Sequence, residues 1–138
     1  MLVEMIYASK PSGVLNQAIT EDILRVARSR NGTRDLTGLL VLNRQFFLQL
    51  IEGDREHVNQ LLCKLVADPR HTDFHMISFK RIEQRSFAQW GMGFVAANAL
   101  NKSVLLRNGV SSSFNPYTMS EASVRELLNE MRAEATIG

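Results

Sequence analysis

Residues 46–54 read Phe46-Phe47-Leu48-Gln49-Leu50-Ile51-Glu52-Gly53-Asp54, and no other segment says as much about the fold. The apolar part of this run is short and predicts a strand over 46–51 that is covered on both faces. Gln49 is the single polar side chain within that strand. Burial of a carboxamide costs several kcal/mol unless both its donor and its acceptor are used. We therefore expect Gln49 to have a polar partner inside the protein.

The best candidate for that partner is Tyr7, which ends a second strand-like segment over 2–7. Like Gln49, it carries a polar group on an otherwise apolar segment. Most buried tyrosine and glutamine side chains only satisfy a backbone group, so an ordinary core role stays open for each residue at this point. A site built on the pair needs support from elsewhere in the chain.

Three further strands are expected around these two. The strand over 36–42 is followed by Asn43-Arg44-Gln45, which is short enough to join it to the strand over 46–51 as an antiparallel hairpin. A fourth strand is expected over 74–81, and residues 92–96 supply a fifth.

Two helices are expected between the strands. The first covers about residues 21–30, with Thr20 as its N-cap and Asn31-Gly32 as its C-terminal stop. The second covers residues 55–67, and Pro69 prevents its continuation. The order β-α-β-β-α-β with an additional fifth strand predicts an α+β, ferredoxin-like fold, in which both helices lie on one face of the sheet.

The chain divides by character into one domain over 1–96 and a C-terminal helical extension over 97–138. In the extension we expect a short helical segment near 104–106, turns over 108–116 and a helix over 120–133. The last helix carries an apolar stripe, which either packs on the free face of the sheet or meets another subunit. The sequence leaves both possibilities open.

Composition limits the classes of function. The 138 residues carry a formal net charge of +2, so a basic nucleic-acid surface is not implied. Cys63 is the only cysteine, which excludes an internal disulfide and fits a reducing, cytoplasmic location. No apolar run approaches the roughly 18 residues of a membrane span, so no membrane partner is expected. The three histidines show no ligand-like spacing, so no metal is expected, and no catalytic triad emerges.

Two helix faces define a candidate ligand site. Their members follow the helical repeat, namely Ile23, Ala27 and Asn31 on the first helix, if its last turn extends that far, and Leu61, Leu65 and Asp68 on the second. Two aliphatic stripes that each end in a hydrogen-bonding residue can admit a flat aromatic ligand, edge-on to the sheet above Tyr7 and Gln49. Ordinary helix packing is the alternative.

Six blocks of sequence occur in a fixed order over roughly residues 1–96. They are Met5-Ile6-Tyr7-Ala8-Ser9, Ser29-Arg30-Asn31, Leu36-Thr37-Gly38-Leu39-Leu40, Phe47-Leu48-Gln49-Leu50-Ile51-Glu52-Gly53, Asp68-Pro69-Arg70-His71 and Arg85-Ser86-Phe87-Ala88-Gln89-Trp90-Gly91-Met92-Gly93-Phe94. In this order and spacing they resemble the BLUF family of blue-light sensors that use FAD.

The resemblance implies a role for each matching residue. Tyr7 would be the photochemical electron donor, and Gln49 the amide between it and the N5/O4 edge of the flavin. Asn31 would contact the flavin C4 carbonyl and N3. Trp90 and Met92 would be switch residues on the fifth strand.

Other matching positions would form the rest of the flavin site. Ile23 and Leu65 occupy positions that sandwich the isoalloxazine ring in the family, and the block around Asp68 matches the ribityl chain and the O2 side. The predicted cofactor-binding set is Tyr7, Ile23, Ala27, Asn31, Gln49, Lys64, Leu65, Asp68, Arg70 and His71.

The function that the resemblance implies is a blue-light photoreceptor in sensory transduction. Light would drive electron and proton transfer from Tyr7 through Gln49 and leave the amide rotated or tautomerised. The cofactor would be FAD, with FMN as the alternative flavin, and the signal would pass to a separate effector protein. Self-association through the tail helix or the open sheet face is expected, and catalysed turnover is not.

Two other classes of protein use the same predicted fold. An acylphosphatase-type enzyme needs a phosphate-cradling loop after the first strand, and Pro11-Ser12-Gly13 lacks the run of glycines for it. A non-photoactive interaction module or RNA-binding sheet needs exposed aromatics on the central strands, whereas Phe46 and Phe47 belong to the buried run. Bound yellow colour would separate all three classes.

Overall fold

The computed structural model of this chain describes residues 1–13, 17–88, 91–96 and 114–132, without the side chains of residues 17, 30, 31, 33 and 96. Its centre is a five-stranded sheet in the order β4-β1-β3-β2-β5. The strands are β1 (Leu2–Pro11), β2 (Thr37–Leu42), β3 (Phe47–Asp54), β4 (His71–Arg81) and β5 (Gly93–Ala96). The predicted α+β, ferredoxin-like order with a fifth strand is confirmed.

The middle strand β3 pairs antiparallel with β1 on one side and with β2 on the other. Every residue of β3 except Asp54 is buried, as expected for a strand covered on both faces. The strand extends three residues beyond the predicted end at Ile51, because the Glu52 carboxylate is buried there with hydrogen-bond partners. β5 lies at the sheet edge and pairs parallel with β2.

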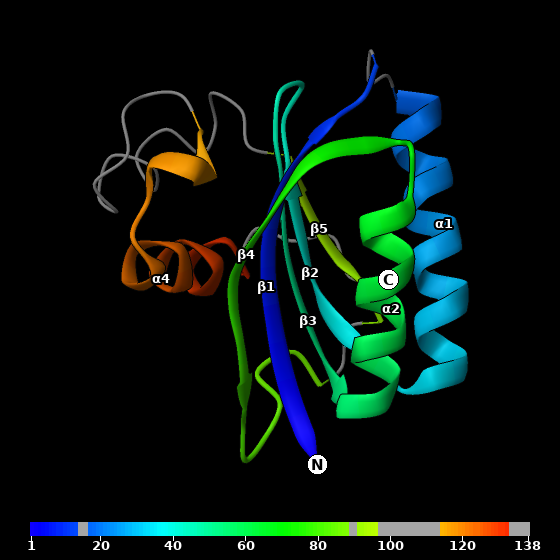
Figure 1. The fold of residues 1–138 in the computed structure, drawn as a ribbon, viewed down its shortest axis with the longest axis vertical. Coiled ribbons are helices and arrows are strands. Elements are labelled where there is room, and N and C mark those ends of the chain that lie inside the picture. The colour runs from blue at the N-terminus through cyan, green and yellow to red at the C-terminus, as the bar shows by residue number, and fades with distance from the viewer. Residues whose placement is uncertain (14–16, 89–90, 97–113, 133–138) are drawn as a thin grey trace.

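Helices α1 (Gln17–Arg34) and α2 (Arg55–Ala67) both cover one face of the sheet (Figure 1). The predicted bounds of the first helix were wrong at both ends, since Thr20 and Gly32 lie inside α1. The chain leaves the helix at Asp35, which adopts a positive φ of 52°. The bounds of α2 are confirmed, with the Asp54 side chain capping its start.

Side-chain alternation along the strands creates two apolar cores. Residues such as Met5, Leu40 and Ile51 face α1 and α2. Their neighbours along the strands, such as Ile6 and Leu50, face the opposite side, which the tail covers. The sheet is therefore buried on both faces, and the register places Tyr7, Gln49 and Met5 on the side of α1 and α2.

The described part of the tail packs on the far face of the sheet (Figure 1). It contains the short 3-10 helix η2 (Pro116–Thr118) and the helix α4 (Glu121–Met131), which is capped by the Ser120 side chain. The apolar stripe of α4 is buried in the core on that face, which answers the question that the sequence left open. The predicted segment at 104–106 and the predicted turns over 108–113 lie outside the described residues. No helix among the residues that the structure describes is long and apolar enough to cross a membrane.

Candidate functional site

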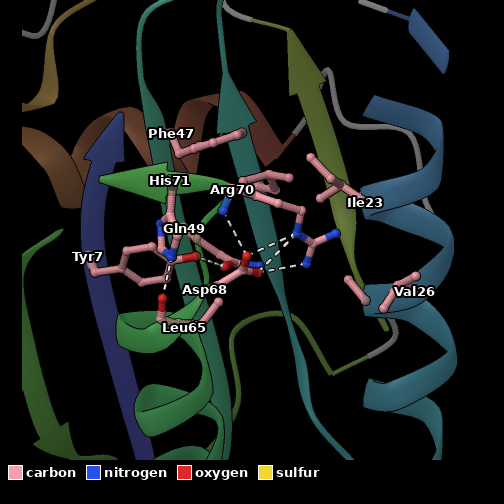
Figure 2. Close-up of a pocket in the computed structure, with 11 residues that line it drawn as sticks. Tyr7, Ile23, Val26, Phe47, Gln49, Leu65, Asp68, Arg70 and His71 are labelled. Atoms are coloured by element: carbon pink, nitrogen blue, oxygen red, sulfur yellow. Dashed lines mark hydrogen bonds and ion pairs between the residues drawn. The ribbon is translucent and has the colours of Figure 1, made fainter. Parts of the chain in front are cut away.

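A pocket opens between α1, α2 and the sheet, on the face away from α4. It encloses about 560 Å³ of space, a figure that includes its open mouth. Its lining residues are Tyr7, Ile23, Val26, Ala27, Leu40, Phe47, Gln49, Leu65, Asp68, Arg70 and His71. Figure 2 shows α1 on one side, with the sheet and the end of α2 opposite.

The floor of the pocket contains the predicted polar pair. Tyr7 and Gln49 are directly opposite each other in the β1–β3 register, and their side chains are 4% and 5% exposed. The Tyr7 hydroxyl donates a hydrogen bond to Oε1 of Gln49. The Tyr7 ring also stacks on Phe74 with a centroid distance of 4.7 Å, which fixes the direction of the hydroxyl. The pair is therefore a preorganised contact and not two separate core residues.

The other end of the Gln49 amide faces Met92. Nε2 of Gln49 lies 3.4 Å from Sδ of Met92, to which it donates a weak hydrogen bond. Met92 is fully buried and immediately precedes β5. Both ends of one amide are thus used, the acceptor toward β1 and the donor toward β5.

The walls of the pocket are aliphatic. Ile23, Val26 and Ala27 line it from α1, and Leu65 lines it from α2. Two apolar walls above a floor with one phenol and one amide fit a flat aromatic ring that has polar atoms along one edge. The residues present therefore fit the isoalloxazine group that the sequence led us to expect.

The rim of the pocket carries a charged pair and a histidine. Arg70 donates to Asp68 with an Nη2–Oδ2 distance of 2.8 Å, and these bonds lower the pKa of the Asp68 carboxyl. His71 contacts the hydroxyl of Ser9 at 2.8 Å and the carbonyl of Leu65 through its two ring nitrogens. The bound His71 ring joins the end of α2 to β1, and Figure 2 shows the three rim side chains turned toward the pocket.

The structure brings together most of the predicted cofactor-binding set. Eight of its members line the pocket, namely Tyr7, Ile23, Ala27, Gln49, Leu65, Asp68, Arg70 and His71. Lys64 is exposed on α2 and does not line the pocket. The Asn31 side chain and Trp90 lie outside the described residues.

Three lining residues were missed by the sequence analysis. Val26 follows Ile23 by one helical turn, a spacing that could have identified it. Leu40 is the cross-strand partner of Gln49, and Phe47 lies two residues before it on the same face of β3. Both follow from the register of the sheet, once that register is known.

The comparison with protein families gives one description. A family model described as BLUF, sensors of blue-light using FAD, matches residues 2–93. The blue light- and temperature-regulated antirepressor BluF of Escherichia coli is 32% identical over 92 residues, which are 67% of this chain and 23% of that protein. The photoactivated adenylate cyclase subunit beta of Euglena longa is 27% identical over 124 residues, 89% of this chain and 14% of that protein. The chain therefore spans less than a quarter of either relative.

Solved structures share the fold over almost the whole chain. BlsA in its photo-activated state has a TM-score of 0.81 at 28% identity, covering 94% of both chains. The BLUF protein BlrB in its dark state has a TM-score of 0.79 at 27% identity, covering 96% of both chains.

Proposed function

Because this chain belongs to the BLUF family of blue-light sensors that use FAD, we propose that its pocket holds the flavin ring and that Gln49 is the light-operated switch. The observation that carries this proposal is the chain of contacts from Tyr7 through Gln49 to Met92 on the pocket floor. A neutral amide can exchange its donor and acceptor ends without changing its charge.

The bound flavin supplies a chromophore that absorbs blue light and accepts an electron when excited. Tyr7 is placed to give an electron to the excited flavin and, through the hydroxyl, a proton toward Oε1 of Gln49. Both would return to Tyr7 within the same light reaction, so that only the orientation or tautomer of the amide is changed at its end. Once the amide has exchanged its ends, its former donor no longer points at the sulfur of Met92. Tyr7, Gln49 and Met92 are buried, so a hydrogen-bond partner lost in this exchange cannot be replaced by water. The exchange therefore favours a different packing of Met92 and of β5, which follows it.

The remaining residues of the site position the ring. Ile23 and Leu65 enclose it from the two helices, and Ala27 leaves room beside it. We assign Asn31 to the C4 carbonyl and N3 edge, and Trp90 to the switch region with Met92. The Asp68–Arg70 pair and His71 lie at the rim and would hold the ribityl side of the flavin. Lys64, which is exposed on α2 outside the pocket lining, would add positive charge on that side.

We assign FAD as the cofactor, on the description of the family. A related protein, BlrP1 of Klebsiella pneumoniae, has been solved with FMN, so the flavin must be identified chemically. Acid release of the bound flavin followed by mass measurement distinguishes the two. If only FMN is released, the assignment of FAD is wrong, but the proposed role of Gln49 as the switch is not affected.

The output of the sensor is assigned to the tail and to a separate effector protein. We assign residues 1–96 to the sensor domain and residues 97–138 to the extension, and the family match over residues 2–93 supports this division. Helix α4 lies on the sheet face opposite the pocket, where a change in β5 reaches it. We assign no catalysed turnover to this chain, and we expect it to act in the reducing cytosol, where the exposed Cys63 thiol stays unpaired. We still propose a homo-oligomer, but the apolar stripe of α4 and the sheet face beneath it cannot form its interface, because they bury each other.

The test uses two pairs of matched variants of the flavin-loaded protein. In the family, the rearranged amide gives the flavin C4 carbonyl a new hydrogen bond, which is expected to shift the absorption band to the red under blue light. Gln49→Leu and Tyr7→Phe remove one functional group each at nearly constant volume, so flavin should remain bound while this red shift disappears. Gln45→Leu, in the exposed β2–β3 turn, and Tyr117→Phe, on the far side of the sheet, keep the shift. A normal shift in Gln49→Leu overturns the assignment of the switch.

A further inference from the structure

Arg28 of α1 makes a contact that flavin binding does not require. Its Nε donates to the backbone carbonyl of Met92 at 3.1 Å. Arg28 is one residue beyond Ala27 and two beyond Val26, both of which line the pocket. The same turn of helix that forms a pocket wall is therefore bonded to the segment that carries the sulfur next to Gln49.

Met92 is consequently held at two points. Its side chain accepts from Nε2 of Gln49 at 3.4 Å, and its main chain accepts from the guanidinium of Arg28. The first bond involves a thioether and is weak, whereas the second is charge-assisted and about twice as strong as a neutral bond. The firmer of the two contacts on Met92 thus comes from α1.

The strand that follows has few bonds of its own. β5 comprises four residues and, within the part of the chain that the structure describes, lies at the sheet edge and pairs with β2 alone, in the parallel arrangement that is slightly weaker per residue. A short edge strand with pairing on one side moves more readily than a central strand. The bond from Arg28 therefore holds the main chain of Met92 in addition to the core packing of its side chain.

We propose that Arg28 is a positioning residue of the photoswitch. Its guanidinium holds the Met92 main chain where the sulfur meets the Gln49 amide, and it thereby sets the rate at which the light-adapted state returns in darkness. This inference rests on the proposed function, because the rate belongs to a photocycle. When the amide has exchanged its ends, Arg28 keeps Met92 near the place to which the donor must return.

The first experiment measures dark recovery after blue light in the flavin-loaded protein. Arg28→Ala should keep the red shift and slow its recovery by roughly three- to tenfold, the range for partial loss of a charge-assisted hydrogen bond. Arg28→Lys, which retains a charged donor, should restore much of the rate. The matched control is Arg25→Ala, since Arg25 lies on the same helix, is 73% exposed and pairs with Asp22. Recovery of Arg28→Ala at the wild-type rate, or faster, overturns the proposal.

A second experiment separates this proposal from the photoswitch itself. Hydrogen exchange of the β5 amides in the dark should be faster in Arg28→Ala than in the wild type and Arg25→Ala. Unchanged exchange in Arg28→Ala shows that the bond does not hold Met92 and overturns the inference. A wild type without any red shift overturns the proposed function instead, and the exchange data still report on the contact.

Discussion

Replacement of the buried Glu52 by alanine should destabilise the protein more than the same replacement of an exposed glutamate. The Glu52 side chain is completely buried on β3 and accepts three hydrogen bonds, from the hydroxyl of Thr37 at 3.0 Å and from the amides of Ser86 at 2.6 Å and Phe87 at 2.9 Å. It therefore ties the segment between β4 and β5 to the sheet at Ser86 and Phe87, a few residues before Met92. Glu52→Ala removes all three bonds at once.

The magnitude follows from the donors that are left. The Phe87 N–H is buried and cannot reach water easily, so the loss of its acceptor costs about 1–3 kcal/mol of folding stability. The two less enclosed donors, on Thr37 and Ser86, add smaller amounts. A total of about 3 kcal/mol is expected, which for a chain of this size lowers Tm by about 10 °C. Glu52→Gln keeps one acceptor oxygen and should fall between the wild type and the alanine variant.

The assay is reversible thermal unfolding followed by circular dichroism. The matched control is Glu83→Ala on the same connecting segment, because the Glu83 side chain is 85% exposed and lies 3.7 Å from Arg81. Such an exposed pair contributes about 0–1 kcal/mol, so the control should unfold near the wild-type temperature. If Glu52→Ala unfolds within about 3 °C of Glu83→Ala, the proposed role of the buried carboxylate is wrong.

Further predictions concern acid stability, a phenol and two glycines. Because the pKa of Asp68 is lowered below its usual 3.8, chiefly by hydrogen bonds from the neighbouring guanidinium, its stabilising effect is present above that value and is lost as the pH falls through the folded-state pKa. In Asp68→Asn, the urea concentration at half-unfolding should thus fall less steeply as the pH is lowered into the acid range. An unchanged dependence on pH would contradict the assigned role of the Asp68–Arg70 pair. Burial first, and then a nearby carboxylate, raises the pKa of Tyr117 to about 12, so Tyr117→Phe should remove the phenolate absorbance that develops in that range, whereas loss of a component near 10 would refute the burial argument. Gly38→Ala should prevent stable folding, because its Cβ would lie 2.0 Å from the backbone oxygen of Leu50, whereas Gly32→Ala has nothing within 4 Å and should be tolerated; equal unfolding midpoints would contradict this reasoning.

The centre of the site could be predicted from the sequence because it violates a local pattern. Gln49 is a polar residue in an apolar strand, and its need for a partner led directly to Tyr7. Hydrophobic periodicity also gave the bounds of α2, where the Asp54 cap and Pro69 agree with it. Local chemistry and the final fold coincide at these positions.

The features that were missed depend on contacts between distant parts of the chain. Asn31-Gly32 is a strong local stop signal, yet α1 continues to Arg34 and ends at the positive φ of Asp35. Glu4 has the pattern of a solvent-facing strand residue, yet it is buried against Arg125 of α4 at 2.5 Å. The guanidinium comes from 121 residues along the chain, a separation that no local pattern encodes.

The contact from Arg28 to Met92 belongs to the same group. Within the sequence, Arg28 is one of several arginines on a helix, and nothing local distinguishes it from Arg25. The structure separates them, because one guanidinium reaches a backbone carbonyl at the start of β5 and the other pairs with Asp22 at the surface. Positioning residues of this kind become visible only when the sheet register and helix placement are known.

The most direct test of the account is the light-minus-dark absorption spectrum of the wild-type protein with its flavin, followed through recovery in darkness. The contacts from Tyr7 through Gln49 to Met92 predict structured flavin bands that move to the red under blue light and return fully in the dark. Bound flavin with bands that do not move would contradict the account, because the pocket would then hold its ligand without a switch.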